Sequence, residues 1–537
     1  MTADPIYYAL LFTISPVQRA VNALTDDTFQ GAHKLTLFDW SLLIPYFAIM
    51  AVLSLYGMYR YEVIRNYFRH RRKLPQNPPR QFETLPPVTV QLPLYNERYV
   101  VERLLESVTR LEYPRELLQI QVLDDSTDET HPFTQALVAR LKAEGHPIEY
   151  RHRANREGFK AGALQEGLKY ATGELIAIFD ADFVPPPDFL MRTVHHFTDP
   201  KVGVVQTRWS YLNRGYNVLT EVEAILLDGH FVLEHVARCG RGLFFNFNGT
   251  AGVLRRQMID DAGGWEHDTL TEDCDLSYRA QLKGWKFIYL PRLDCPSELP
   301  VEMHAFQVQQ SRWAKGLVQV AKKLLPAILR APIPLRHKIE AFFHLTPNIS
   351  YPLMMVVSAL MVPVMIVRFY MGWWQMALID LPLIVASFCS IIAFYLFAER
   401  ELDRKNWKRS IFMMPALLAV GVGLAVINTR AVMEALLGIK SSFVRTAKYA
   451  IAGSRVRIGE TRYRRKSGWL PFIELAIGSY FLVMIFWAID SYNFLALPFL
   501  VLFTGGYYWA GFATLYQEFQ SRLRWQRERR LELEAAR

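Results

Sequence analysis

Cysteine is scarce in this sequence, and the patterns that cysteines usually form are missing. Only four occur among 537 residues, and their spacing fits neither a zinc-binding motif nor a disulfide framework. We therefore expect the middle of the chain to lie in a reducing compartment. The four are Cys239, Cys274, Cys295 and Cys389.

A cleavable signal peptide and an internal repeat are also lacking. Residues 6–14 are apolar, but no basic segment precedes them and no small-residue cleavage site follows. We predict that residues 1–40 form a non-cytoplasmic or interfacial segment, in which Tyr7–Ala20 lies on the membrane surface.

Charged residues make up 21% of the chain and apolar residues 51%, but the two classes are unevenly distributed. Polar, alternating sequence fills the first half, and long apolar runs fill the second. The net charge is +10. Because the basic residues lie beside apolar runs, they indicate anionic lipid headgroups and the positive-inside bias rather than nucleic acid. The length predicts two or three structural units.

The first run long enough to span a bilayer is residues 41–58. Residues 1–40 before it carry two basic and four acidic residues, and a basic, Pro-rich linker of residues 59–87 follows it. The positive-inside rule therefore places the N-terminus outside and the linker in the cytoplasm. The basic patch of the linker consists of Arg60, Arg65, Arg69, Arg71, Arg72 and Lys73.

Further apolar runs follow residue 345. If all of them spanned, the loop 440–466, with nine Lys and Arg against the single acid Glu460, would lie outside. We therefore predict that the run 410–428 lies in the interface or re-enters, which leaves five spans, with the N-terminus outside and the C-terminus in the cytoplasm. The runs are 350–367, 377–397, 410–428, 470–489 and 494–515. They form a transmembrane channel region at 346–515, preceded by interfacial helices at 301–345 and followed by a charged cytoplasmic tail at 516–537.

Residues 88–300 have the pattern of an α/β domain. Short β-branched runs alternate with stretches of helical period, which predicts parallel strands joined by crossover helices. Such sheets bind ligands at the carboxyl ends of their strands. The expected strands are 88–92, 119–123, 175–179 and 202–206, and the expected helices include 100–111 and 160–170.

Three acidic motifs, the first made of two sequences, follow expected strands or begin an expected helix. The sequences VQLPLYNE at 90–97 and LDDSTDET at 123–130 place carboxylates where they can bind a base or a ribose; alternatively, the acids cap the next helix. In FDADF, Asp180 and Asp182 can share Mg²⁺ or Mn²⁺ that bridges a diphosphate. In TED at 271–273, one acid can be a general base, or the acids simply favour a helix N-terminus.

A fourth motif, QQSRW at 309–313, combines an arginine and a tryptophan. Arg312 offers a fork of donors that fits a diphosphate. Trp313 offers a flat apolar face for a sugar ring. The alternative interpretation is an ordinary membrane-interface pair on a basic amphipathic helix.

Taken in order, the four motifs resemble the signature D, D, D, QxxRW of the family-2 glycosyltransferases of the cellulose-synthase-like group. The resemblance extends from about Val88 to Gly316. Within the group, the sequence looks most like the mannan-synthase-like and xyloglucan-backbone-synthase-like branches. It rests also on the blocks REGFKAGAL, FNFNGTAGVLRR and SELP. It implies an α/β GT-A-type (Rossmann-like) cytoplasmic domain inserted in a helical transmembrane domain, and no C-terminal regulatory β-barrel is expected.

The resemblance also implies roles for individual residues. Asp273 would be the catalytic base, with Glu272 beside it, and Asp180 and Asp182 would hold the metal, Mg²⁺ or Mn²⁺. The acceptor site would consist of Asn248, Gly249, Thr250, Asp273 and Trp313. The donor site would consist of Tyr95, Glu97, Asp124, Asp125, Lys160, Asp180, Asp182, Gln309, Arg312 and Trp313.

A weaker match lies in the basic loop 440–468. The sequence FVRTAK resembles the FxVT gating loop of cellulose synthases: Phe443 and Thr446 fit, Lys448 follows them, and Arg445 interrupts the pattern. We expect this loop to enter the active site over bound nucleotide.

The resemblance implies a multi-pass enzyme of the plasma (inner) membrane that builds and translocates a β-1,4-type glycan. It would use UDP-glucose or GDP-mannose, by a single inverting displacement. Its partners would be the nucleotide-sugar, the growing glycan and membrane lipids, with an oligomer or accessory protein left open and no nucleic acid. Alternatives are a non-processive enzyme that makes a glycolipid or polyprenyl-phosphate sugar, and a channel whose soluble domain only binds nucleotide. The donor sugar and the linkage stay open.

Overall fold

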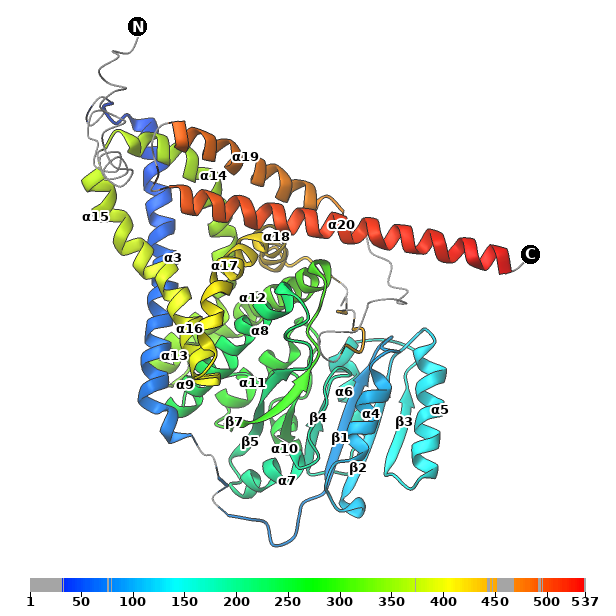
Figure 1. Ribbon diagram of the computed structural model, residues 1–537. Helices are drawn as coiled ribbons and strands as arrows, with labels where there is room; N and C mark the ends of the chain where they lie inside the picture. The colour runs from blue at the N-terminus through cyan, green and yellow to red at the C-terminus, as the bar shows by residue number, and fades with distance from the viewer. Residues whose placement is uncertain are drawn as a thin grey trace.

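The computed structural model describes most of the chain as a sheet domain joined to a set of apolar helices (Figure 1). The described residues are 31, 33–74, 77–78, 80–371, 373–441, 445–446, 448–451, 468–490, 494 and 496–535. The predictions made for Tyr7–Ala20, Phe443 and residues 452–467 of the basic loop lie outside them.

The sheet domain is built on seven strands in the order β3-β2-β1-β4-β6-β5-β7. All four strands expected from the sequence are present, and β5 continues five residues beyond the expected end at 206, to Tyr211. The strands are β1 (Val88–Leu94), β2 (Leu118–Asp124), β3 (Ile148–His152), β4 (Leu175–Ile178), β5 (Val202–Tyr211), β6 (Gly252–Arg255) and β7 (Lys286–Ser297).

The prediction of a parallel sheet is right for one part of the sheet and wrong for another. β1 pairs in parallel with β2 and β4, and β5 pairs in parallel with β7. Between these groups β6 runs antiparallel to both β4 and β5. β6 was not predicted, because its four residues are too few for a hydrophobic period to be visible. β3 and β7 were missed because polar residues or prolines interrupt them.

Two hydrophobic cores cover the two faces of the sheet. One packs β1 and β2 against α4 (Val101–Thr109) and α5 (Thr130–Ala143). The other packs β4, β5 and β6 against α6 (Phe159–Leu168), α9 (His235–Arg241) and α11 (Glu272–Leu282). The second core also includes Tyr67 and Phe394 from helices outside the sheet domain. The remaining elements of this domain are α7 (Phe189–Thr193), α8 (Val218–Asp228), the π-helical turn η4 (Gly229–Glu234) and α10 (Arg256–Asp261).

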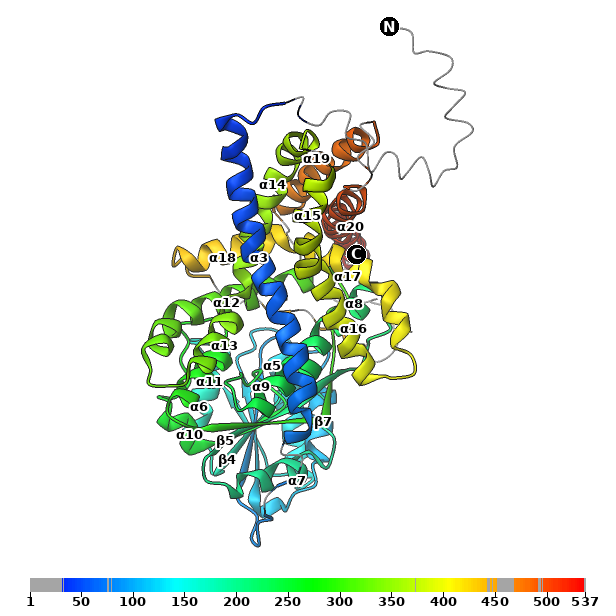
Figure 2. The ribbon, with the colours of Figure 1, turned by 90° about the vertical axis from the view of Figure 1, so that its left-hand side faces the viewer.

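The helical part begins with α3, a 34-residue helix that runs along most of the height of the molecule (Figure 2). It continues past the expected span end at residue 58 and carries the basic patch as far as His70. The other helices are α12 (Met303–Arg330), α13 (Leu335–Leu345), α14 (Ser350–Phe369), α15 (Trp373–Ile384), η6 (Val385–Cys389), α16 (Ser390–Leu402), η7 (Trp407–Met413), α17 (Met414–Gly423), α18 (Ala425–Leu436), α19 (Leu470–Asp490) and α20 (Leu497–Ala535).

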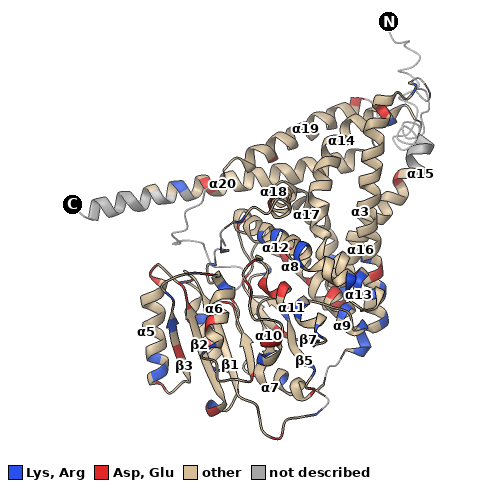
Figure 3. Cartoon of the chain, turned by 180° about the vertical axis from the view of Figure 1, so that it is seen from behind, with Lys and Arg blue, Asp and Glu red and all other residues tan. Residues whose placement is uncertain are grey.

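Four helical segments of the described residues are long and apolar enough to cross a membrane: 37–73, 347–369, 378–402 and 470–490. A fifth candidate is the pair 407–423 and 425–436, which bends by 42° inside the predicted interfacial run 410–428. The expected span 494–515 falls in α20, which is not among these segments and continues without a break into the charged tail. Charged residues gather on the sheet domain and the helix ends beside it, and α14, α17 and α19 carry almost none (Figure 3).

One close crossing fixes α3 against the other apolar helices. A Cβ on Gly57 would lie 1.8 Å from the backbone oxygen of Ala386 in η6 and 3.0 Å from the hydroxyl of Ser390. Such small-residue contacts let membrane helices approach closely. Farther along α3, the Tyr67 hydroxyl donates to Glu401 at 2.8 Å and Arg71 pairs with the same carboxylate.

We expect Gly57→Ala to lower the thermal stability of the detergent-purified protein, because the new methyl group would force α3 away from a backbone atom. Overpacking of this kind costs roughly 1–3 kcal/mol. Gly421→Ala is the matched control: it also lies in an apolar helix, but its Cβ would meet nothing within 4 Å, and alanine stabilises helices. Equal melting temperatures for the two variants would contradict this crossing.

Candidate active site

A cleft of about 1190 Å³, partly open to solvent, lies at the carboxyl ends of the central strands and under α12. Each of the sequence motifs contributes to its wall. Nearly all of the predicted site residues line it: Tyr95, Glu97, Asp125, Lys160, Asp180, Asp182, Asn248, Gly249, Glu272, Asp273, Gln309, Arg312, Trp313, Thr446 and Lys448. The fold therefore assembles residues that are more than 350 positions apart in the chain.

Two predicted residues support the cleft from behind instead of lining it. Asp124 is fully buried, and its carboxylate accepts hydrogen bonds from the Ser126 N–H at 2.8 Å and the Tyr150 hydroxyl at 2.5 Å. Asp124 therefore holds the turn that follows β2 and does not cap the next helix, which begins only at Thr130. Thr250 is also buried, and its hydroxyl accepts from the Asp180 N–H at 2.9 Å. It thus holds the turn that carries Asp180.

Asp125 lies in the cleft wall but is already engaged by an arginine. Both of its oxygens accept from Arg153, with 2.7 Å between the Arg153 Nε and Oδ1. Arg153 also donates to the carbonyl oxygens of Glu157 and Phe159. Asp125 therefore ties the end of β2 to the start of α6.

The two aspartates of FDADF each face a lysine. The Lys160 Nζ lies 2.5 Å from Asp180 Oδ1 and 2.9 Å from the carbonyl oxygen of Gly249. The Lys448 Nζ lies 2.7 Å from Asp182 Oδ2. Burial lowers the pKa of Lys160, but the neighbouring carboxylates, Asp180 foremost, raise it above its ordinary value. Two ammonium groups thus balance two carboxylates in the cleft.

The described part of the basic loop is anchored in the cleft through Glu298 of the SELP block. Its carboxylate accepts from the Tyr449 N–H at 2.7 Å and pairs with Arg103 of α4 at 2.9 Å. Lys448 donates to the Glu298 carbonyl oxygen, and the Tyr449 hydroxyl donates to Glu302. Glu298 is therefore a site residue that the sequence motifs did not single out.

Glu97, from the YNE turn, faces the same loop. The Arg445 NH1 lies 3.9 Å from Glu97 Oε1. Burial raises the pKa of Glu97 to about 8 against the opposing charge of Arg445, and Asp182 and Asp180 raise it further. The residue that interrupts the loop motif therefore faces an acid of the donor motif.

Asp273 lies in the first turn of α11 and lines the cleft. Its Oδ1 accepts from the Cys274 N–H at 2.8 Å. Burial and then the neighbouring Glu272 raise the pKa of Asp273 to about 7, against the opposing charge of Lys160. Gly249 must be glycine, because its φ is +78° and a Cβ there would lie 2.9 Å from Asp273 Oδ2. A carboxylate with such a pKa is well suited to general-base chemistry near neutral pH.

One face of α12, the helix that carries QQSRW, packs against the residues just before Asp273. Arg312, Gly316, Gln319 and Lys323, spaced four, three and four residues apart, lie on that face. A Cβ on Gly316 would lie 2.6 Å from the Thr271 methyl carbon, and Gln319 Oε1 accepts from the Leu270 N–H at 2.9 Å.

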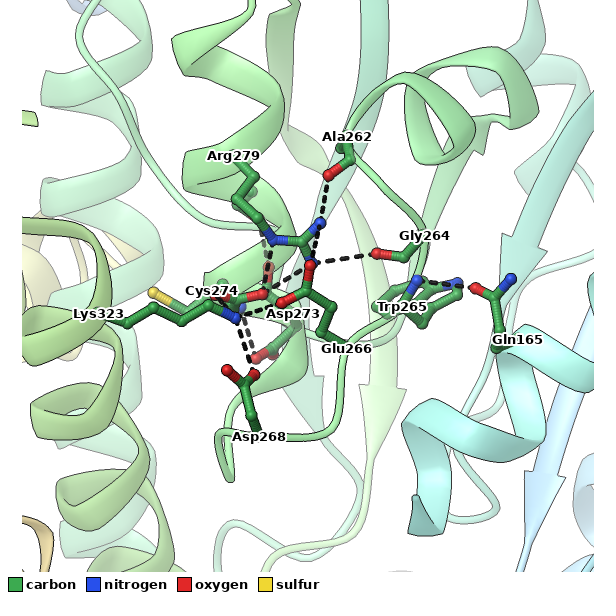
Figure 4. Close-up of polar contacts among 12 residues, drawn as sticks. Gln165, Ala262, Gly264, Trp265, Glu266, Asp268, Asp273, Cys274, Arg279 and Lys323 are labelled. Atoms are coloured by element: carbon green, nitrogen blue, oxygen red, sulfur yellow. Dashed lines mark hydrogen bonds and ion pairs between the residues drawn. The ribbon is translucent and has the colours of Figure 1, made fainter. Parts of the chain in front are cut away.

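Lys323 continues that face into a cluster of acids (Figure 4). Its ammonium lies 2.5 Å from Glu266, 2.8 Å from Asp268 and 3.0 Å from Asp275. Arg279 donates to Asp275 at 2.7 Å and to the Gly264 carbonyl oxygen at 3.0 Å. These contacts fix α12 relative to α11, whose first turn contains Asp273.

The remaining polar groups of the cleft include Arg312 and two buried groups that have no hydrogen-bond partner among the described residues. Burial lowers the pKa of Arg312, although Glu272, Asp180 and Asp273 oppose this shift. The Oε1 of Gln309 is buried without a hydrogen-bond partner. The same holds for the indole Nε1 of Trp209, a cleft residue on β5 that belongs to no motif in the sequence.

The cleft carboxylates suit a magnesium or manganese site that phosphates complete. Such ions are commonly held by one or two carboxylates plus phosphate oxygens, and Asp180 and Asp182 offer two. Among the described residues, two other groups have the spacing of a three-ligand site, Asp124–His131–His152 and Glu266–Asp268–Asp275. Lys323 bonds to all three acids of the second group, and neither group is the FDADF pair.

Lys448 and a cation should compete for Asp182. We expect Lys448→Met to raise the affinity for Mn²⁺, measured by calorimetry with a nucleoside diphosphate present, by about tenfold, which is roughly 1.4 kcal/mol. Asp182→Asn should weaken Mn²⁺ binding instead. The control is Lys169→Met, since Lys169 pairs with Glu166 on the surface. An unchanged Mn²⁺ affinity in Lys448→Met would place the cation away from Asp182.

Comparison with known proteins gives matches to glycosyltransferase families. Residues 89–257 match the model of glycosyl transferase family 2, and residues 175–398 match that of glycosyl transferase family group 2. The second match extends past the sheet domain into α16.

Curated relatives are similar over the same region. The chain is 43% identical over 250 residues to glucomannan 4-beta-mannosyltransferase 2 of Arabidopsis thaliana, which covers 46% of this chain and 47% of that protein. It is 43% identical over 254 residues to glucomannan 4-beta-mannosyltransferase 1 of Oryza sativa subsp. japonica, covering 46% and 48%. The chain thus matches about half the length of these relatives.

Among solved structures, the mannosyltransferase PcManGT from Pyrobaculum calidifontis, in complex with GDP-Man and Mn²⁺, superposes with a TM-score of 0.47. The two are 24% identical, and the superposition covers 65% of this chain and 99% of that one.

Proposed function

We propose, from the premise that this chain carries a glycosyl transferase family 2 domain, that it is a membrane-embedded hexosyltransferase that builds a β-linked glycan. The observation that carries the proposal is the single cleft in which the FDADF carboxylates, Asp273 and Arg312 lie together under α12. The relatives named 4-beta-mannosyltransferases favour a mannosyl donor, GDP-mannose, over UDP-glucose.

In this proposal Asp273 is the general base of a single inverting displacement. It accepts the proton of the 4-hydroxyl of the terminal acceptor sugar, which attacks the anomeric carbon of the donor from the face opposite the diphosphate. The glycosidic bond forms as the bond to the diphosphate breaks. General-base catalysis of this kind contributes about 10²–10⁴-fold in rate.

The cations of the cleft stabilise the leaving diphosphate. Lys160 and Arg312 supply fixed positive charge beside the FDADF carboxylates, and such preorganised charge is the usual source of the largest catalytic effect. Mg²⁺ or Mn²⁺ held by Asp180 and Asp182 would neutralise further phosphate charge. Tyr95, Glu97 and Asp125 surround the place of the nucleotide, and Trp313 supplies the platform for the acceptor sugar.

The loop that carries Thr446 and Lys448 closes the cleft over the donor. Two contacts support this role: Lys448 lies 2.7 Å from Asp182 of FDADF, and the Tyr449 N–H donates to Glu298. We further propose that synthesis is processive, at the cytoplasmic face of the plasma membrane, and that the apolar helices pass the glycan outward. Trp313 lines the cleft, and its helix α12 packs against α18 and α20 of the apolar part, which supports this route.

Incubation of the purified protein with Mn²⁺ or Mg²⁺ and each labelled nucleotide-sugar tests the proposal. We expect labelled polymer from GDP-mannose or UDP-glucose, degraded by a β-1,4-specific glycosidase. A single-sugar lipid product would contradict processivity but keep the transferase assignment. Absence of any transferred sugar, with nucleotide still bound, would contradict the enzyme assignment itself.

Asp273 should control the pH dependence of that reaction. Because only the ionised carboxylate accepts a proton, kcat/KM should rise with pH and level off above about 7, the pKa raised by burial and Glu272. Asp273→Asn should lower turnover by about 10²–10⁴-fold and leave nucleotide binding intact. Asp188→Asn, a change on the surface, is the control. Equal loss of binding and turnover would make Asp273 structural.

A further inference from the structure

Two histidines outside every sequence motif converge on a cleft residue. His230 lies in the π-helical turn η4, and His235 begins α9 directly after it. In an α-helix, residues five apart are rotated by about 140°. The π-helical turn, in which the His235 N–H donates to the His230 carbonyl oxygen, brings the two rings to 4.2 Å between centroids. Such single π-turns are frequent at functional sites.

Both rings contact the side-chain amide of Asn248, which lines the cleft. The His235 Nε2 lies 2.6 Å from Asn248 Oδ1, and the His230 Nε2 lies 3.0 Å from Asn248 Nδ2. The Asn248 backbone N–H donates to Gln206 Oε1 at 2.9 Å. The backbone and the side chain of Asn248 are therefore both held by hydrogen bonds.

A carboxylate decides which way this amide points. The His230 Nδ1 lies 2.9 Å from Glu234 Oε2, so that nitrogen carries the proton and donates it. The His230 Nε2 is then a bare acceptor that can bond only to the amide nitrogen of Asn248. With the amide reversed, its oxygen would face a nitrogen that has no proton. Glu234 thus determines the tautomer of His230, and His230 in turn determines the orientation of the Asn248 side-chain amide.

The charge of Glu234 is in turn maintained by an arginine. Arg238 lies 3.2 Å from Glu234 and 2.7 Å from Glu340 of α13. Burial raises the pKa of Glu234, but Arg238 and the bond from His230 outweigh burial and hold it at about 2. Tyr59 of α3 donates to the same Glu340. The chain of contacts therefore extends from the cleft to the first long helix.

We propose that His230, Glu234 and His235 are positioning residues for the acceptor: they hold the Asn248 carboxamide so that its second N–H donates to a hydroxyl of the acceptor sugar in the cleft. The inference rests on the proposed function. Among the described residues no protein atom accepts that second N–H. The same orientation leaves the amide oxygen, already bonded to His235, unable to turn toward the sugar.

His235→Phe tests this inference, because the ring keeps its packing on Phe245 and Tyr289 while the donor to Asn248 is lost. With the donor that the wild-type protein uses, we expect glycan elongation to fall by about tenfold, equivalent to one hydrogen bond of roughly 1.4 kcal/mol. Nucleotide binding and hydrolysis of the donor by water should not change. His235→Gln, which retains an N–H donor, should elongate better than His235→Phe.

A double-mutant cycle separates positioning from simple stability. In an Asn248→Ala background, His235→Phe should cause no further loss of elongation, since the group it orients is gone. His196→Phe, at an equally buried histidine remote from the cleft, is the control and should keep the wild-type ratio of elongation to hydrolysis. If His235→Phe protein does not fold, the pair His230→Gln and His230→Leu provides the same comparison.

The outcomes distinguish this inference from the proposed function. Equal loss of elongation and hydrolysis in His235→Phe, or the same loss in the Asn248→Ala background, would overturn the positioning role while the transferase assignment stands. A wild-type protein that transfers no sugar would overturn the proposed function, and this inference with it.

Discussion

The contact between α12 and the turn that precedes α11 is the constraint on which the candidate site depends. Asp273 belongs to the sheet domain, whereas Arg312 and Trp313 belong to a helix that continues toward the apolar part. Their relative position is set where Gly316 meets Thr271 without room for a side chain. Lys323 reinforces the contact with three carboxylates. A shift of about 1 Å between two such groups can cost roughly 10²-fold in a positioned reaction.

The cleft itself is a balance of opposite charges. Asp180 faces Lys160, Asp182 faces Lys448, and Glu97 faces Arg445. An anionic diphosphate entering this arrangement finds cations already in place, so little reorganisation is needed. The same balance explains why the described part of the loop lies in the cleft: Lys448 pairs with Asp182, a carboxylate that would otherwise face only like charges there.

The sheet domain and the helices form a shared core. Tyr67 of α3 and Phe394 of α16 pack in the same cluster as β4 and β6, so the wall of the cleft rests directly on long apolar helices. Gly229, at the start of the π-helical turn, would collide with Phe394 and Tyr395 if it carried a Cβ. The turn that orients Asn248 is therefore held by the same helices.

Much of the site was predictable from the sequence because it depends on local patterns. A β-branched run followed by acids predicts a strand end, and strand ends of neighbouring strands meet at one edge of a sheet, which brought Glu97, Asp125 and Asp180 together. The α/β class was predictable because the hydrophobic periods of strands and helices alternate along residues 88–300. It could not predict the antiparallel β6, since four residues carry no period and strand direction is decided by pairing with β4 and β5.

Only the tertiary structure decided which polar groups line the cleft and which are buried behind its wall. Asp124 and Asp125 are adjacent in sequence, yet one turns inward to Tyr150 and the other toward Arg153 and the cleft wall. His230 and His235 belong to no motif, because their convergence depends on a π-turn, and Lys448 meets Asp182 across 266 positions of chain. The sequence by itself determined the chemical groups and the strand ends that carry them. Their distances, partners and protonation were decided by long-range packing, because burial and neighbouring charge are properties of the folded chain alone.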